Sequence, residues 1–181
     1  MLTINDITPS SKDLDNSFYN YQISLTTKLD NLDTDFDQEI INEIVLWKVN
    51  RYAEMDSETL NLINQIKKDD TQLNPDLTDA ILFNLLGKKQ KGIRLAMAST
   101  ILRFKNPRIY QIIDQRVYRF IYGQELKYSE TDINQQIAIY LGYLTNLRNV
   151  CSKHNIAFET ADRIFYLMDK YYNTGETLRG Y

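Results

Sequence analysis

Apolar residues recur at intervals of three and four along most of this 181-residue chain, and no segment alternates convincingly between apolar and polar residues. That spacing places apolar side chains on one face of an α-helix, whereas a strand would need a period of two. Only six glycines and three prolines interrupt the pattern. It predicts an all-α fold, an orthogonal multi-helix bundle, with helices over 13–29, 36–55, 57–68, 75–86, 95–104, 115–122, 132–153 and 159–172.

Several predicted helices start at residues that cap helices. Ser57 follows Asp56, and Pro75 follows Asn74 at a first turn. Asp132 precedes the longest periodic run. Two helices carry an apolar stripe over several turns, which we expect to be core: Ile137, Tyr140, Leu141, Leu144, Leu147 and Cys151 in one, and Ile164, Phe165, Met168 and Tyr171 in the other.

The length of the chain is typical of one domain with a sizeable core. We therefore expect a single all-helical domain over 1–181, with flexible ends at 1–12 and 173–181. The start of the chain lacks the basic and apolar segments of a secretion signal, and no run approaches the roughly 18 apolar residues that a membrane span needs. A cytoplasmic location without a membrane partner is expected.

Metal and disulfide chemistry have few candidate residues. Cys151 is the only cysteine, so it can form neither an internal disulfide nor the four-thiolate cage of an iron–sulfur cluster. The only histidine, His154, lies three residues on, and two ligands are fewer than a zinc site uses. We expect no metal and no cofactor.

Charge is strongly segregated along the chain. Residues 87–128 hold ten Lys and Arg against two acids, a net charge of +8 within a protein of net charge −3. Residues 1–40 carry −6 and residues 41–86 carry −4. An anionic partner meets the local potential rather than the total, so the basic segment is a candidate nucleic-acid surface. Two alternatives stay open: a solvated face, or pairing within the fold against the acidic first 86 residues.

A phosphate site is predicted where the basic segment enters a helix. Gly92 permits a tight turn and close approach of another chain, because it has no side chain beyond Cα. The helix that follows directs unpaired N–H groups and the positive end of its dipole outward, where an anion binds. The nucleic-acid-binding candidates around that point are Lys88, Lys89, Lys91, Gly92 and Arg94.

The order of these parts resembles the helix-hairpin-helix DNA glycosylase superfamily. Gly92-Ile93-Arg94 stands at the position of the hairpin turn, and the small residues from Ala98 to Thr100 stand in the helix that follows. Ile112-Ile113-Asp114 matches the hydrophobic-hydrophobic-Asp element that opens the next helix. The resemblance covers 80–122, and implies a glycosylase-like fold with the helix-hairpin-helix and the Asp-bearing element in that range.

What this resemblance implies is a DNA-repair protein, either a base-excision glycosylase or a non-catalytic lesion binder, that grips double-stranded DNA and offers a pocket to a flipped-out base. Asp114 is then the catalytic residue, stabilising positive charge on the sugar or orienting the attacking water. Arg116 and Arg119 join the nucleic-acid-binding set. The base-stacking candidates are Trp47, Tyr52 and Tyr118. For Asp114 an ordinary N-cap is the competing interpretation, and for Trp47 a core position.

Two positions depart from the family pattern. Arg94 replaces the second hairpin glycine, which brings a side chain to a position that needs a positive φ or close phosphate approach. Ala96 stands where bifunctional members carry the lysine that forms a Schiff base. An active enzyme is therefore expected to be monofunctional.

A second class of function stays open beside DNA repair. Asp30, Asp33, Asp35, Asp37 and Glu39 crowd into ten residues and are suited to recruit a basic protein, mimic nucleic acid or cover the basic face. The alternative function is therefore a non-catalytic interaction or regulatory module on the same helical fold. RNA binding is a third possibility. The sequence does not separate it from DNA binding, because it contains no motif that would recognise the 2′-hydroxyl of RNA.

Overall fold

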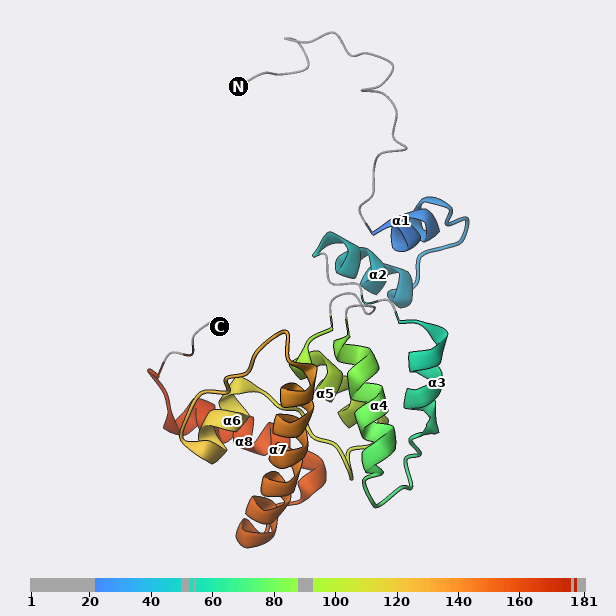
Figure 1. The fold of residues 1–181 in the computed structure, drawn as a ribbon. Helices are drawn as coiled ribbons and strands as arrows, with labels where there is room; N and C mark the ends of the chain where they lie inside the picture. Colours follow the sequence, from blue (N-terminus) through green and yellow to red (C-terminus); the bar gives the residue numbers. More distant parts are fainter. Residues whose placement is uncertain (1–21, 50–52, 54, 88–92, 177, 179–181) are drawn as a thin grey trace. The chain divides into compact units, whose positions relative to one another are not determined.

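The computed structural model describes residues 22–49, 53, 55–87, 93–176 and 178. It divides into two compact units, residues 1–52 and 53–181, and each is described by itself. The prediction of one domain over 1–181 stays a prediction. All regular structure in the described ranges is helical, as Figure 1 shows, which confirms the all-α class. None of the helices within these ranges is both long and apolar enough to cross a lipid bilayer.

The first unit contains helices α1 (Ile23–Asp30) and α2 (Gln38–Lys48), which pack against each other. The α2 helix begins at Gln38 because the Asp37 side chain accepts a hydrogen bond from Ile40 N at 2.9 Å. It ends at Lys48, so the predicted helix over 36–55 was too long. Residues 13–21 of the other long prediction lie outside the described residues.

The second unit contains α3 (Ser57–Gln65), α4 (Pro75–Leu86), α5 (Leu95–Lys105), α6 (Gln115–Tyr122), α7 (Ile133–His154), the 3-10 turn η3 (Phe158–Thr160) and α8 (Ala161–Tyr172). The predicted bounds of α4 and α6 are confirmed. So are the three predicted helix starts, because each capping side chain accepts a backbone N–H bond. The caps are Asp56 to Thr59 N at 2.7 Å, Asn74 to Leu77 N at 3.1 Å and Asp132 to Gln135 N at 2.9 Å.

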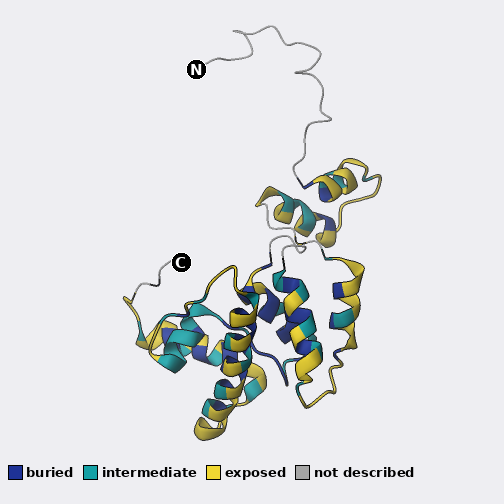
Figure 2. Ribbon diagram, in the orientation of Figure 1, coloured by how far each residue is buried: buried dark blue, intermediate teal, exposed yellow. Residues whose placement is uncertain are grey.

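The core of the second unit forms where α4 packs against α3, α5 and α7. Figure 2 shows buried residues on the faces that these helices turn toward one another. A second contact joins α6 to α8. The predicted stripe of α7 is buried at Ile137, Tyr140, Leu144, Leu147 and Cys151. The stripe of α8 was partly wrong: Phe165 is buried, but Tyr171 is 76 % exposed.

The turn between α4 and α5 is only partly described. Residues 88–92 lie outside the described residues, so the helix-hairpin-helix turn stays a prediction. Ile93 is buried, and Arg94 has an extended backbone, with φ −114° and ψ 172°. A side chain at position 94 therefore meets none of the strain that a positive φ would impose.

Candidate functional site

The segment that leads to Asp114 is held from the side by α7. The hydroxyl of Tyr140 donates to the carbonyl oxygen of Gln111 at 3.0 Å, and that of Tyr143 donates to Ile112 O at 2.7 Å. Both tyrosines are buried, and burial raises the pKa of each well above its ordinary value, so the hydroxyls remain donors. The carbonyls of Gln111 and Ile112 lie outside the helices, so the tyrosine hydroxyls supply hydrogen bonds that a helical backbone would otherwise provide.

The other end of this segment is held as firmly. Asn106 is fully buried, and its amide donates to Lys67 O at 2.6 Å and to Asp70 O at 3.0 Å. Arg148 of α7 donates to Arg108 O at 2.7 Å. Thr78 of α4 hydrogen-bonds to the Tyr110 hydroxyl at 2.7 Å, and Ser99 of α5 accepts from Ile113 N at 3.2 Å. The loop after α3 and the helices α4, α5 and α7 therefore together place the residue at the end of this segment.

Asp114 is the N-cap of α6. Its Oδ1 atom accepts hydrogen bonds from Arg116 N at 2.7 Å and Val117 N at 3.3 Å. The N-cap interpretation is therefore confirmed. The Asp114 side chain is half-buried, and it also lines a pocket beside this cap.

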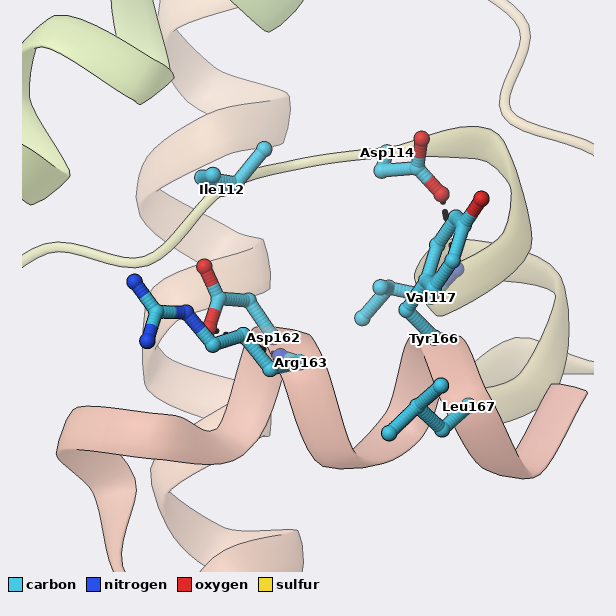
Figure 3. A pocket seen from close by; sticks show the side chains of 7 residues that line it. All are labelled: Ile112, Asp114, Val117, Asp162, Arg163, Tyr166 and Leu167. Atoms are coloured by element: carbon cyan, nitrogen blue, oxygen red, sulfur yellow. Dashed lines mark hydrogen bonds between the residues drawn. The ribbon is translucent and has the colours of Figure 1, made fainter.

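A cavity of about 390 Å³ lies between this cap and α8. Figure 3 shows Ile112, Asp114 and Val117 facing Asp162, Arg163, Tyr166 and Leu167 of α8, with the ring of Tyr166 extending from α8 toward the side of the pocket that carries Asp114. Apart from two carboxylates and one guanidinium, the lining is apolar and aromatic. It consists of Ile112, Asp114, Val117, Asp162, Arg163, Tyr166 and Leu167.

Asp162 is the second carboxylate of this pocket, and it was not among the site residues predicted from the sequence. Its side chain is 3 % exposed, and its Oδ2 lies 3.4 Å from Nε of Arg103, an ion pair without hydrogen-bond geometry. Arg103 also donates to Glu159 O at 3.1 Å. A signal was present: Asp162 and Asp169 are seven residues apart, about two helical turns, on the apolar face of α8.

Arg116 and Arg119, both predicted to contact nucleic acid, point to Asp169 of α8. Arg119 donates through Nη2 at 2.7 Å and through Nε at 3.0 Å, and Arg116 donates through Nη1 at 3.3 Å. Burial would raise the pKa of the Asp169 carboxyl, but hydrogen bonds from Arg119 and Asn173 outweigh it, so its pKa lies below the ordinary value. The Arg119 guanidinium thus donates to an acid of the fold, and the predicted contact of both arginines with nucleic acid stays a prediction.

The basic segment is thus partly neutralised by the C-terminal third of the chain. Arg103, Arg116 and Arg119 pair with acids of α8. Arg94 pairs with Glu130 at 3.0 Å, with both side chains largely exposed. Pairing within the fold was one of the predicted alternatives, but these partners lie after residue 129 rather than in the first 86 residues.

The other predicted site residues are not gathered at the pocket by the described structure. Lys88, Lys89, Lys91, Gly92 and Tyr52 lie outside the described residues. Trp47 belongs to the first unit, where its Nε1 donates to Thr26 Oγ1 at 2.9 Å. Tyr118 stacks on Tyr122 of the same helix, with 4.3 Å between ring centroids. The aromatic residue that lines the pocket is Tyr166, which was not among the predicted base-stacking residues.

Metal ligation has no candidate among the described residues, since no three His, Cys, Asp or Glu side chains there group together. The pocket therefore offers carboxylate, guanidinium and phenol groups for its chemistry. Comparison with known proteins adds no relative: no family model, no curated protein and no solved structure matches this chain.

Proposed function

We propose that this protein binds nucleic acid and admits an unpaired base to the pocket beside Asp114, as a divergent helix-hairpin-helix DNA glycosylase without lyase activity. One observation carries the proposal: a carboxylate at a helix start lines a cavity of about 390 Å³ whose other walls are mainly apolar and aromatic. Cavities of this size hold small organic molecules. A base that has left the stack is a flat ring suited to such walls.

Asp114 is the group that acts on the sugar. When the glycosidic bond breaks, its electrons leave with the base and positive charge builds on the sugar. Water adds its hydroxyl to the same carbon, and the remaining proton of the water neutralises the departing base. A carboxylate stabilises that charge or accepts the proton of the water. The bonds from Arg116 N and Val117 N hold Asp114 in one orientation, so little reorganisation is needed.

The absence of lyase chemistry at the family position follows from one side chain. A Schiff base needs an amine, and Ala96 in the first turn of α5 has none. The proposed products are therefore an abasic sugar and the released base, with the strand intact.

The experiment compares the wild type with Asp114→Asn on a duplex that carries a stable abasic-site analogue, on an undamaged duplex and on a panel of damaged-base duplexes. We expect the wild type to prefer the abasic duplex, with a log–log salt slope of roughly −3 or steeper. Asp114→Asn should abolish base release yet bind equally or more tightly, because it removes a negative charge and keeps the shape. Base release that survives Asp114→Asn contradicts the catalytic assignment.

The alternative function is a non-catalytic interaction module that binds a basic protein through the first unit. The observation in its favour is that Asp30, Asp33 and Asp35 are exposed, as are the apolar side chains of Val45 on α2 (55 %) and of Val49 (52 %), which follows the last residue of α2. Exposed apolar residues beside one sign of charge are typical of protein-binding surfaces. Titration of the full chain with a basic amphipathic peptide tests it. Binding that Asp33→Asn and Asp35→Asn weaken supports this function, and equal binding contradicts it.

A further inference from the structure

Helix α8 sorts its charges between its two faces. Its only two acids, Asp162 and Asp169, have side chains that are 3 % and 0 % exposed. Both bind arginines of α5 and α6. The acids of α8 are thus buried, and the exposed charged side chains of the helix are all cations, which stand beside aromatic rings.

The outer face of α8 has a regular composition. It begins at Arg163 and continues with the residues three, four, seven and eight positions later, a spacing that places all of them on one side of the helix. All are exposed, with Leu167 at 64 % and Tyr171 at 76 %. The exposed acids nearest in sequence, Glu159 and Glu176, lie beyond the two ends of α8. The outer face of α8 consists of Arg163, Tyr166, Leu167, Lys170 and Tyr171.

Its rings are supported from within the fold. The Nζ atom of Lys170 lies 5.7 Å from the centroid of the Tyr166 ring, and the guanidinium carbon of Arg116 lies 6.0 Å from it. Tyr171 meets Tyr172 edge-on at 4.9 Å, and Tyr172 stacks against Phe120 at 6.3 Å. Rings held in this way lose little further conformational freedom when a ligand stacks on them.

We propose that the outer face of α8 binds the unpaired strand of a nucleic acid, with bases stacked on Tyr166 and Tyr171 and phosphates beside Arg163 and Lys170. Alternating cations and aromatic rings suit such a strand, because every base has a face to stack and every linkage carries a negative charge. The face is continuous with the pocket, which Arg163, Tyr166 and Leu167 also line. The inference therefore rests on the proposed function: the strand on α8 is the one that delivers a base toward Asp114.

The test measures binding of the full chain to a short labelled single-stranded oligothymidine, with the RNA equivalent as a second arm. Tyr171→Ala should weaken binding about tenfold with little change in salt dependence, since a stacking contact releases no counterion. Lys170→Gln should make the salt slope about one unit shallower. The matched controls are Phe83→Ala, an exposed aromatic residue of α4 that is 52 % exposed, and Lys153→Gln at the exposed end of α7.

Unchanged affinity in Tyr171→Ala, or an equal loss in Phe83→Ala, overturns the inference. The inference is also overturned if the protein binds anionic lipid vesicles through Tyr171 and does not bind oligonucleotides. If substitutions on the outer face of α8 leave oligothymidine affinity unchanged while Asp114→Asn abolishes base release, the inference fails and the proposed function stands. If no nucleic acid binds even at low salt, both fail. Thermal unfolding of each variant checks the fold, which Tyr171→Ala should preserve because that ring is largely exposed.

Discussion

The hydroxyl of Tyr143 donates a 2.7 Å hydrogen bond to the carbonyl oxygen of Ile112. This bond joins the longest helix of the second unit to a residue two positions before Asp114. Tyr143 is buried and Ile112 is partly buried, so a carbonyl that lost this donor would lie in a partly desolvated position. The placement of the candidate carboxylate therefore depends on a side chain that stands 31 positions after Ile112 in sequence.

Tyr143→Phe should lower the free energy of unfolding by about 1–2 kcal/mol, because it leaves the Ile112 carbonyl without its donor. Urea denaturation measures the change. Tyr171→Phe is the matched control, since that ring is 76 % exposed, and it should change stability by less than about 0.5 kcal/mol. Equal effects of the two substitutions would show that the Tyr143 bond does not stabilise the fold.

Asp114→Ala should destabilise the protein by about 1 kcal/mol, because α6 loses the acceptor for Arg116 N and Val117 N. Asp114→Asn keeps a side-chain oxygen and should cost only a few tenths. Denaturant titration separates the two variants. A large loss in Asp114→Asn would mean that the negative charge itself stabilises the fold.

Asp169→Asn should lower the free energy of unfolding by about 3 kcal/mol, because it leaves the Arg119 guanidinium, with a side chain 13 % exposed, without its carboxylate. Lys170→Gln, on the exposed side of the same helix, is the control and should have little effect. Thermal or urea unfolding measures both. A loss under 1 kcal/mol would contradict the importance of this ion pair.

The same ion pair predicts a pH dependence. The pKa of Asp169 is depressed in the folded protein, so its stabilisation is complete above the unfolded pKa of about 3.9 and decreases as pH falls through the folded value. Stability measured from neutral pH downward should fall more in the wild type than in Arg119→Gln, which lacks the main hydrogen bond. Parallel curves would remove Asp169 as the cause.

Arg103 and Asp162 should be energetically coupled, because each is buried and each is the charged partner of the other. Arg103→Ala and Asp162→Ala each leave one buried charge, at a cost of about 3 kcal/mol. The double variant should be more stable than the sum of the two losses predicts, by about 1–3 kcal/mol. Additive losses in a double-mutant cycle would mean that the 3.4 Å approach contributes no pair energy.

The Cys151 thiol should react slowly with alkylating reagents in the folded protein. It is 3 % exposed, and burial raises its pKa, so little thiolate is present and less is accessible. Alkylation followed by mass spectrometry measures the rate, with the urea-unfolded chain as the reference. A native rate close to the unfolded rate would mean that this end of α7 opens readily.

The helices could be predicted because their signals are local. The starts of α3, α4 and α7 depend on one capping side chain each, and the bounds of α6 follow from Asp114 at one end and Gly123 at the other. Gly123 takes the positive φ, 69°, that ends the helix. The interpretation of Asp114 as an N-cap needed no tertiary information for the same reason.

By itself, then, the sequence determined the helical class, most helix bounds in the second unit, the cap at Asp114 and the concentration of positive charge between residues 87 and 128. Only the tertiary structure decided which charges face inward. Arg116 and Arg119 donate to Asp169, fifty or more residues away, and Tyr166 rather than Tyr118 lines the pocket. Helical periodicity is a property of neighbours along the chain, whereas the partner of a buried charge depends on which helices pack together, and that contact has no local signature.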